Sequence, residues 1–305
     1  MINLFNINHY KIDTSRFTNQ LHDKIVTDFE NNFAKYVGAK YACSANSASS
    51  LLFLALKDLN TKVRIPSIMP AAVPNVILNT NNEIEFYDNI EWVGNYYKLY
   101  GSIFDSAQEV SKNQYKDLNN NDATMIFSFY PTKPIGSCDG GMIVSDNKDK
   151  IDYYKVMTLN GMYYSENNWD RKQVAVGYKM HMSSIQAYIA NENLKKLDAK
   201  NSRLDEISSL YNKKLGYNNK SRHLYRIRVR NNKHFISEMK KNEIFCGIHY
   251  EACHKNPCFI KKTEQYLPVS EEESLRTISL PFHENLSDMD VDKIIKTVLT
   301  LKRLQ

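Results

Sequence analysis

The chain has 305 residues, more than one domain usually holds, and its 42% hydrophobic content is enough for a sizeable core. Its 40 Lys and Arg outnumber its 34 Asp and Glu, which gives a net charge of +6 that is spread along the chain. There is no Lys/Arg block, recognised nucleic-acid motif, secretory signal or apolar run of roughly 18 residues, so we expect neither a nucleic-acid partner nor a membrane partner.

The pattern of apolar residues predicts three regions. Residues 1–28 form an N-terminal arm, residues 29–182 form a large α/β domain, and residues 183–305 contain linking helices and a small C-terminal α+β domain. Residues 225–230 alternate apolar and charged side chains, as a half-exposed strand does. From Ser183 onward, one or two long helices are predicted by apolar residues at helical spacing, namely Ile185, Ile189, Leu194, Leu197, Leu204, Ile207, Tyr211 and Leu215.

A candidate anion-binding turn precedes the first apolar helix of the large domain. Residues 44–50 are mostly small and polar, and the residues that follow them have an apolar face at helical spacing. Small polar residues that open a helix leave backbone N–H groups free to hold a phosphate. The same residues would also cap a helix that binds nothing.

A carboxylate follows the next candidate strand. Ile103 and Phe104 lead into Asp105, at the place where a strand of an α/β sheet presents an acid at its carboxyl end. In enzymes that use pyridoxal phosphate (PLP), such an acid keeps the pyridine nitrogen protonated. An Asp after a strand also serves as a helix N-cap, and the sequence leaves both roles open.

A lysine lies in a short loop between two buried strands. Residues 125–127 and 142–144 are continuous apolar runs, and Lys133 lies in the Pro- and Gly-punctuated segment between them. A lysine held out of bulk water can form a Schiff base with an aldehyde, whereas a solvated surface lysine does no chemistry. Both interpretations are compatible with this segment alone.

The cysteines indicate a reducing compartment. Their odd count of five, with no CxxC pair, predicts free thiols in a cytoplasmic protein. His249, Cys253, His254 and Cys258 crowd together, but their spacing matches no standard zinc pattern, so we expect no metal.

Taken in order, these segments resemble the DegT/DnrJ/StrS family of PLP-dependent nucleotide-sugar aminotransferases over nearly the whole chain. The segments that carry the resemblance are residues 29–41, 46–48, 105–108, 128–133, 177–187, 223–225, 247–250, 267–269 and 279–281. The resemblance implies an aspartate-aminotransferase-like fold (PLP fold type I), with a mixed, mostly parallel sheet and a small C-terminal α+β domain. It also implies a homodimer with shared active sites.

The resemblance assigns roles residue by residue. It implies that Lys133 holds PLP covalently and moves the reacting proton, and that Asp105 pairs with the ring nitrogen. Gln108 would lie near the ring, and the phosphate would be held by the Ser128 hydroxyl and by the backbone amides of Ser47 and Ala48. The donor would be an amino acid, by family habit glutamate, and the acceptor a nucleotide-linked keto-sugar for surface polysaccharide such as lipopolysaccharide.

Four substitutions depart from the family pattern. Ala48 replaces a Thr and loses one hydroxyl contact to phosphate. Lys179 replaces an Asn that reaches the neighbouring subunit's cofactor phosphate, where a cation could still bind as a point charge. His181 replaces an Arg, and Pro70 stands where an aromatic ring normally stacks on the cofactor.

The chain is also shortened between Asp88 and Asp105. Only 16 residues separate them, whereas family members carry an additional strand and helix that need about 30 residues. We therefore expect a large domain trimmed on one face. Together with the substitutions, this leaves a non-catalytic binding or assembly subunit as an alternative. A PLP-dependent sugar dehydratase, in which a His replaces the lysine, is disfavoured by Lys133.

Overall fold

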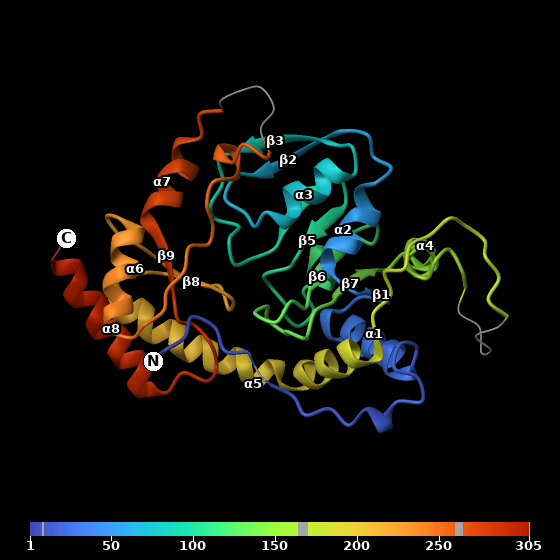
Figure 1. Cartoon of the computed structure of the whole chain (residues 1–305), viewed down its shortest axis with the longest axis horizontal. Helices are drawn as coiled ribbons and strands as arrows, with labels where there is room; N and C mark the ends of the chain where they lie inside the picture. The colour runs from blue at the N-terminus through green and yellow to red at the C-terminus, as the bar shows by residue number, and fades with distance from the viewer. Residues whose placement is uncertain (8, 164–169, 260–264, 305) are drawn as a thin grey trace.

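The computed structural model describes residues 1–7, 9–163, 170–259 and 265–304 (Figure 1). Its α-helices are α1 (Lys24–Val37), α2 (Ala48–Leu56), α3 (Ala72–Asn79), α4 (Lys148–Thr158), α5 (Ser184–Leu215), α6 (Asn232–Lys241), α7 (Pro268–Arg276) and α8 (Asp288–Arg303). Its strands are β1 (Tyr41–Ala45), β2 (Lys62–Pro66), β3 (Glu83–Tyr87), β4 (Tyr97–Tyr100), β5 (Ile103–Asp105), β6 (Thr124–Ser128), β7 (Gly141–Ser145), β8 (Tyr225–Arg228) and β9 (Thr277–Leu280). Within these residues, no helix combines the length and apolar character needed to cross a membrane.

The main sheet has the strand order β1-β7-β6-β5-β4. Within the described chain, β5 and β6 run parallel, while the other three neighbouring pairs are antiparallel. Strands β2 and β3 form a separate parallel pair. The predicted α/β class is confirmed, but the expectation of a mostly parallel sheet is wrong for the main sheet.

The antiparallel pairing of β4 with β5 has a local cause at the shortened segment. Residues 88–105 are all described, and they contain turns, β4 and β5 but no helix. Two residues, Gly101 and Ser102, connect β4 to β5. A parallel pairing needs a crossover of a dozen or more residues, so this short link dictates a hairpin. The expected trimming of one face therefore takes the form of an antiparallel edge strand.

Helices cover both faces of the main sheet (Figure 1). Asp23 caps α1, whose buried face includes Phe29 and Phe33 and packs on the sheet together with α5. Helix α2 packs on the opposite face through Leu51 and Leu52. Helix α1 begins at Lys24, several residues before the predicted boundary at residue 29.

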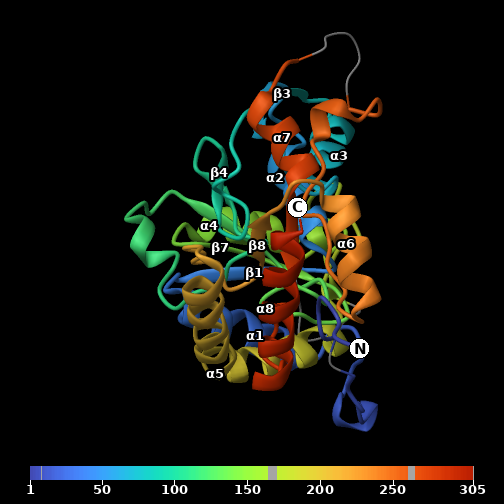
Figure 2. The ribbon, with the colours of Figure 1, turned by 90° about the vertical axis from the view of Figure 1, so that its left-hand side faces the viewer.

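The C-terminal part has its own apolar core. A single 32-residue helix, α5, begins with a capping box made by Ser183 and Gln186, so the predicted long linking helix is confirmed. Its second half packs with α6, α8 and the antiparallel pair β8–β9. Ile2 joins this core; its amide donates to the Glu243 carbonyl, and its carbonyl accepts from the Phe245 amide. Figure 2 shows the N-terminus on the same side of the molecule as α6 and α8. The first residues of the chain are therefore attached to its last third.

Candidate active site

The Lys133 loop is folded back on itself, and its Gly136 carbonyl accepts a hydrogen bond from the Asn193 side chain of α5 at 2.7 Å. The Lys133 amide donates to the Tyr130 carbonyl at 2.8 Å, and the Ser137 amide donates to Phe129 at 2.7 Å. Gly136 has a φ of +64°, and a β-carbon there would lie 2.7 Å from the Pro131 carbonyl oxygen. Only glycine adopts this close, left-handed turn without strain. The loop thus has a defined shape that fixes where the lysine emerges.

Lys133 and Asp105 share one poorly solvated environment. Burial lowers the pKa of Lys133 to about 8, and the nearby Asp105 carboxylate opposes that shift. Burial also raises the pKa of Asp105, against the effects of the Ala107 amide, Lys133 and the Tyr97 hydroxyl. The structure therefore brings together the lysine and the carboxylate that the sequence singled out.

Both oxygens of Asp105 accept hydrogen bonds. The Ala107 amide donates to Oδ1 at 2.9 Å, which makes Asp105 the cap of the turn that follows β5. The Tyr97 hydroxyl donates to Oδ2 at 3.2 Å. The cap occupies only Oδ1, so the capping role of Asp105 does not exclude the predicted role as a site carboxylate.

The predicted anion-binding turn lies against the ends of β6 and β7. Ser47 caps α2 by accepting a hydrogen bond from the Ser50 amide at 3.2 Å. Ser128 pairs with Gly141 across β6–β7, and Gly141 touches the start of α2 at Ala48. The Ser128 hydroxyl accepts from the Tyr130 amide at 3.3 Å. The N-terminus of α2 and Ser128 are thus both neighbours of Gly141.

Gln108 contacts the turn before β4. Its side-chain oxygen accepts a hydrogen bond from the Gly94 amide at 2.8 Å, and the residue is buried. This contact fixes the side-chain amide of Gln108 against the shortened segment. A role near a cofactor ring, which the resemblance implies for Gln108, stays a prediction.

Lys179 is exposed, and its segment packs on the anion-binding turn. The Asn46 amide donates to the Met180 carbonyl at 2.7 Å, one residue beyond Lys179. His181 lies with its ring 4.5 Å from that of His22, and burial together with Lys179 and Arg171 lowers the His181 pKa. Basic groups therefore gather beside the turn.

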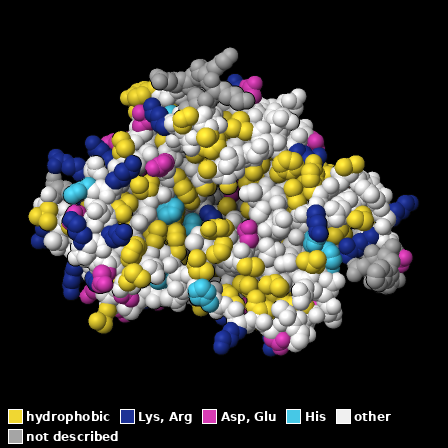
Figure 3. Space-filling model, in the orientation of Figure 1, with side chains coloured by type: hydrophobic (Ala, Val, Ile, Leu, Met, Phe, Trp, Pro, Cys, Tyr) yellow, Lys and Arg dark blue, Asp and Glu magenta, His cyan; other side chains and the backbone are white. Residues whose placement is uncertain are grey.

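Side chains from the C-terminal part and the arm complete the surroundings of Lys133. Burial and the Lys133 charge lower the pKa of His223, and the same causes lower the pKa of His249 to about 4. The Phe5 ring stacks on His223 at 5.9 Å and meets His249 edge-on at 5.7 Å. Figure 3 shows histidine, cationic and acidic side chains gathered where this face is hollowed.

Pro70 lies in a separate cavity that includes Tyr250. It lines an open cavity of about 530 Å³ together with Met69 and Tyr250. Burial and the Asp105 charge raise the pKa of Tyr250, so its hydroxyl stays protonated at neutral pH. An aromatic side chain is therefore available near Asp105, although Pro70 itself offers none.

Sequence reasoning missed Tyr97 and did not assign functions to His223, His249 and Tyr250. The histidines and Tyr250 lay in segments that carried the family resemblance, which was the available signal. The sequence around Tyr97 gave no signal of its role, because its contact with Asp105 depends on how β4 pairs with β5.

The DegT/DnrJ/EryC1/StrS aminotransferase family model matches residues 13–91 and 87–299, which is most of the chain. The chain belongs to this family. The match breaks where the chain is shortened, at the turn before β4. As a member, the protein is an enzyme of the aminotransferase class.

Relatives of this family member include two bacterial proteins and one solved structure. A Campylobacter jejuni protein named UDP-4-amino-4,6-dideoxy-N-acetyl-beta-L-altrosamine transaminase is 29% identical, over 73% of this chain and 74% of its own. Spore coat polysaccharide biosynthesis protein SpsC of Bacillus subtilis is 28% identical, over 90% and 88%. The Streptococcus pneumoniae protein Spr1654, solved in a PLP form, superposes with a TM-score of 0.81 at 18% identity, over 98% of each chain. This last similarity establishes the shared fold.

Proposed function

We propose that this protein is a PLP-dependent aminotransferase that transfers an amino group from an amino acid to a nucleotide-linked keto-sugar used for surface polysaccharide. The observation that carries the proposal is the electrostatic interaction of Lys133, whose pKa is lowered to about 8, with the buried Asp105. A buried amine and a buried carboxylate with perturbed pKa values that interact in this way are typical of a catalytic site. The names of the Campylobacter and Bacillus relatives support the sugar substrate.

The residues present fit PLP. The cofactor has an aldehyde, a basic ring nitrogen and a phosphate, and the site offers an amine, a buried carboxylate and a helix N-terminus with a neighbouring hydroxyl. Gly141 keeps the space beside Ala48 free of a β-carbon, so the backbone amides at this turn remain available. When bound, PLP supplies an electron-accepting ring that stabilises negative charge at the carbon bearing the amine.

Each residue then has a distinct task. Asp105 holds a proton on the ring nitrogen by charge pairing. Lys133 takes the reacting proton and returns it through Nζ, and a pKa near 8 suits transfer in both directions at neutral pH. Ser128 and the amides of Ser47 and Ala48 bind the phosphate. His223 and His249 are neutral at this pH and add no charge beside the lysine.

The space beside the Lys133 loop supports a substrate larger than an amino acid. An open cavity of about 910 Å³ lies between this loop, α5 and the N-terminal arm. Lys196 and Lys200 line it, and Lys200 also pairs with Glu284 at 3.6 Å. Cavities of this size accommodate ligands of drug size or larger, and the lysines suit a nucleotide diphosphate. Glutamate as the donor follows from the family resemblance.

We further propose a cytoplasmic homodimer in which Lys179 of one subunit faces the cofactor phosphate of the other. Its exposure and its place beside the anion-binding turn support this arrangement. No membrane or nucleic-acid partner is part of the proposal.

The experiment adds PLP to the cofactor-free protein and records visible absorbance, then screens nucleotide-linked keto-sugars with glutamate. We expect a PLP band and amine transfer in the wild type, and neither covalent capture nor turnover in Lys133→Ala. Lys112→Ala, which changes an exposed lysine, is the matched control and should behave as wild type. A wild type that takes up no PLP would favour the binding-subunit alternative. Near-normal transfer by Lys133→Ala would refute the assignment of the lysine.

A further inference from the structure

The hairpin that replaces the missing strand and helix delivers a tyrosine to Asp105. Tyr97 on β4 is the direct cross-strand partner of Asp105 on β5. Directly opposed residues of an antiparallel pair project their side chains to the same face, with β-carbons about 5 Å apart. The Tyr97 hydroxyl accordingly reaches Asp105 Oδ2 at 3.2 Å.

An irregularity in the register between β4 and β5 determines that Tyr97 is the residue opposite Asp105. The register runs Tyr97 to Asp105 and Lys98 to Phe104, but Tyr100 pairs with Ile103, so Leu99 is an extra residue on β4. If Leu99 were not an extra residue, the register counted from the turn would place Lys98 opposite Asp105. Tyr97 would then project to the other face of the sheet. The bulge therefore decides that a hydroxyl, and not a second ammonium, meets the carboxylate.

The tyrosine ring is held rigidly. Tyr97 is buried, and its ring centroid lies 4.6 Å from that of Trp92. Trp92 is fixed in turn, because its indole Nε1 donates to the Ile68 carbonyl at 3.0 Å. A donor whose rotamer is already fixed by packing loses little freedom when it binds the carboxylate.

We propose that Tyr97 is a positioning residue that orients Asp105 and favours its ionised form for pairing with the cofactor ring nitrogen. This role rests on the proposed function of the site. The Ala107 amide fixes one oxygen and Tyr97 the other, so the carboxylate cannot rotate without losing a bond.

The electrostatics agree with this role. Burial raises the pKa of Asp105, while the Ala107 amide, Lys133 and Tyr97 lower it. Tyr250 also faces the carboxylate, and its pKa is raised by burial and by Asp105. Removing the Tyr97 donor makes Asp105 a stronger base, so that the shared proton moves from the ring nitrogen toward the carboxylate. The ring then accepts electrons less well.

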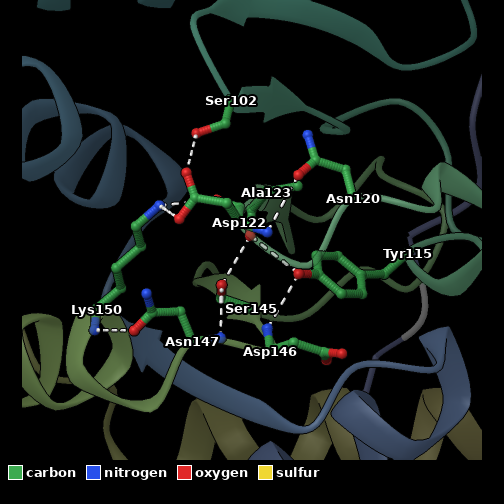
Figure 4. Close-up of polar contacts among 9 residues, drawn as sticks. All are labelled: Ser102, Tyr115, Asn120, Asp122, Ala123, Ser145, Asp146, Asn147 and Lys150. Atoms are coloured by element: carbon green, nitrogen blue, oxygen red, sulfur yellow. Dashed lines mark hydrogen bonds and ion pairs between the residues drawn. The ribbon is translucent and has the colours of Figure 1, made fainter.

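Tyr97→Phe tests the role, because it removes the hydroxyl and keeps the ring against Trp92. The loss of a hydrogen bond to a charged group at this distance changes an equilibrium constant or a rate constant roughly tenfold. We expect the PLP dissociation constant to rise about tenfold and kcat to fall about tenfold. The matched control is Tyr115→Phe, which removes another buried hydroxyl that donates to the Ala123 carbonyl and accepts from the Asp146 amide (Figure 4). The control should leave both quantities unchanged.

A double-mutant cycle separates positioning from a general loss of packing. If Tyr97 acts through Asp105, Tyr97→Phe should change neither PLP affinity nor kcat by more than about twofold in an Asp105→Asn background. Equal penalties in both backgrounds, or no penalty in either, would overturn the role of Tyr97. A wild type that binds no PLP would instead refute the proposed function, and this role with it. The two failures are distinguished by the wild-type spectrum.

Discussion

Gly141 lies so close to Ala48 that a β-carbon on residue 141 would be 2.5 Å from the Ala48 amide nitrogen. The atoms it would meet belong to backbone, so they cannot move aside as a flexible side chain could. Gly141 is also the strand partner of Ser128. This glycine therefore sets the distance between the first turn of α2 and the hydroxyl proposed to hold the same phosphate.

Gly141→Ala should displace the start of α2 and weaken PLP binding. We expect the protein to fold with a loss of about 1–3 kcal/mol in the free energy of unfolding, as other overpacked sites show. The PLP dissociation constant should rise at least tenfold, as measured by absorbance titration. Pyridoxal, which lacks the phosphate, should bind the variant and the wild type almost equally. A similar loss for both ligands would show that the substitution acts elsewhere.

The local elements of this fold can be predicted because their signals are local. Apolar runs identified β6 and β7, and helical spacing identified α5. The direction of strand pairing was not predictable in this way, because it depends on how the chain connects its strands. The length between Asp88 and Asp105 indicated the trimming, but only the two-residue turn of the hairpin shows that the result is an antiparallel edge.

In the candidate site, too, residues in continuous motifs were predictable and residues brought together by the fold were not. Asp105 stood out because it ends an apolar strand, and Lys133 because it lies in the loop between two apolar strands; the motifs of both are continuous in the sequence. Tyr97 could not be found, since its relation to Asp105 is set by a bulge. Phe5 and His223 are more than 200 residues apart in the sequence and meet only because the arm packs on the C-terminal part.

The amine of Lys133 should titrate near pH 8 in the native protein. It is protonated and unreactive below this pH and becomes nucleophilic above it, whereas an unfolded lysine titrates near 10.4. The rate at which a small acylating reagent modifies the Lys133 peptide, followed by mass spectrometry, should rise with a midpoint near 8, and near 10.4 in urea. Asp105→Asn removes a charge that raises this pKa, so its midpoint should be lower still. A native midpoint near 10 would mean that the amine is solvated.

Glu30 should stabilise the strand that leads to the anion-binding turn. It is buried, and its Oε1 accepts from the amide and hydroxyl of Ser44 at 2.7 and 2.8 Å, while Oε2 lies 3.2 Å from Lys155 Nζ. Glu30→Gln keeps the shape but turns a donor toward the ammonium. We expect it to cost about 1–3 kcal/mol in urea unfolding at pH 7. Lys155→Met should cost less, about 1 kcal/mol or below, because that lysine is partly exposed. The opposite order would mean that the ion pair dominates.

Lys179 should contribute to PLP binding through its charge. A charge-assisted contact to phosphate is worth roughly 1.5–3 kcal/mol, so Lys179→Ala should raise the PLP dissociation constant about ten- to a hundredfold. Lys179→Asn should recover part of the affinity, because an amide can donate to the same phosphate. Lys172→Ala changes another exposed lysine of the same segment and should have no effect. Equal affinities in all four proteins would exclude a role for Lys179 at the phosphate.

Mixed dimers of Lys133→Ala and Lys179→Ala chains then show whether Lys179 binds the cofactor phosphate of its own subunit or that of the partner subunit. The Lys133→Ala homodimer should bind PLP without a covalent bond, and the Lys179→Ala homodimer should bind PLP weakly. If Lys179 acts across the interface, a mixed dimer has one site that combines Lys133 of one chain with Lys179 of the other. That site should capture PLP with wild-type affinity, at one equivalent per dimer. If Lys179 acts within its own chain, every site in the mixed dimer lacks one of the two lysines, and titration would find no tight covalent site.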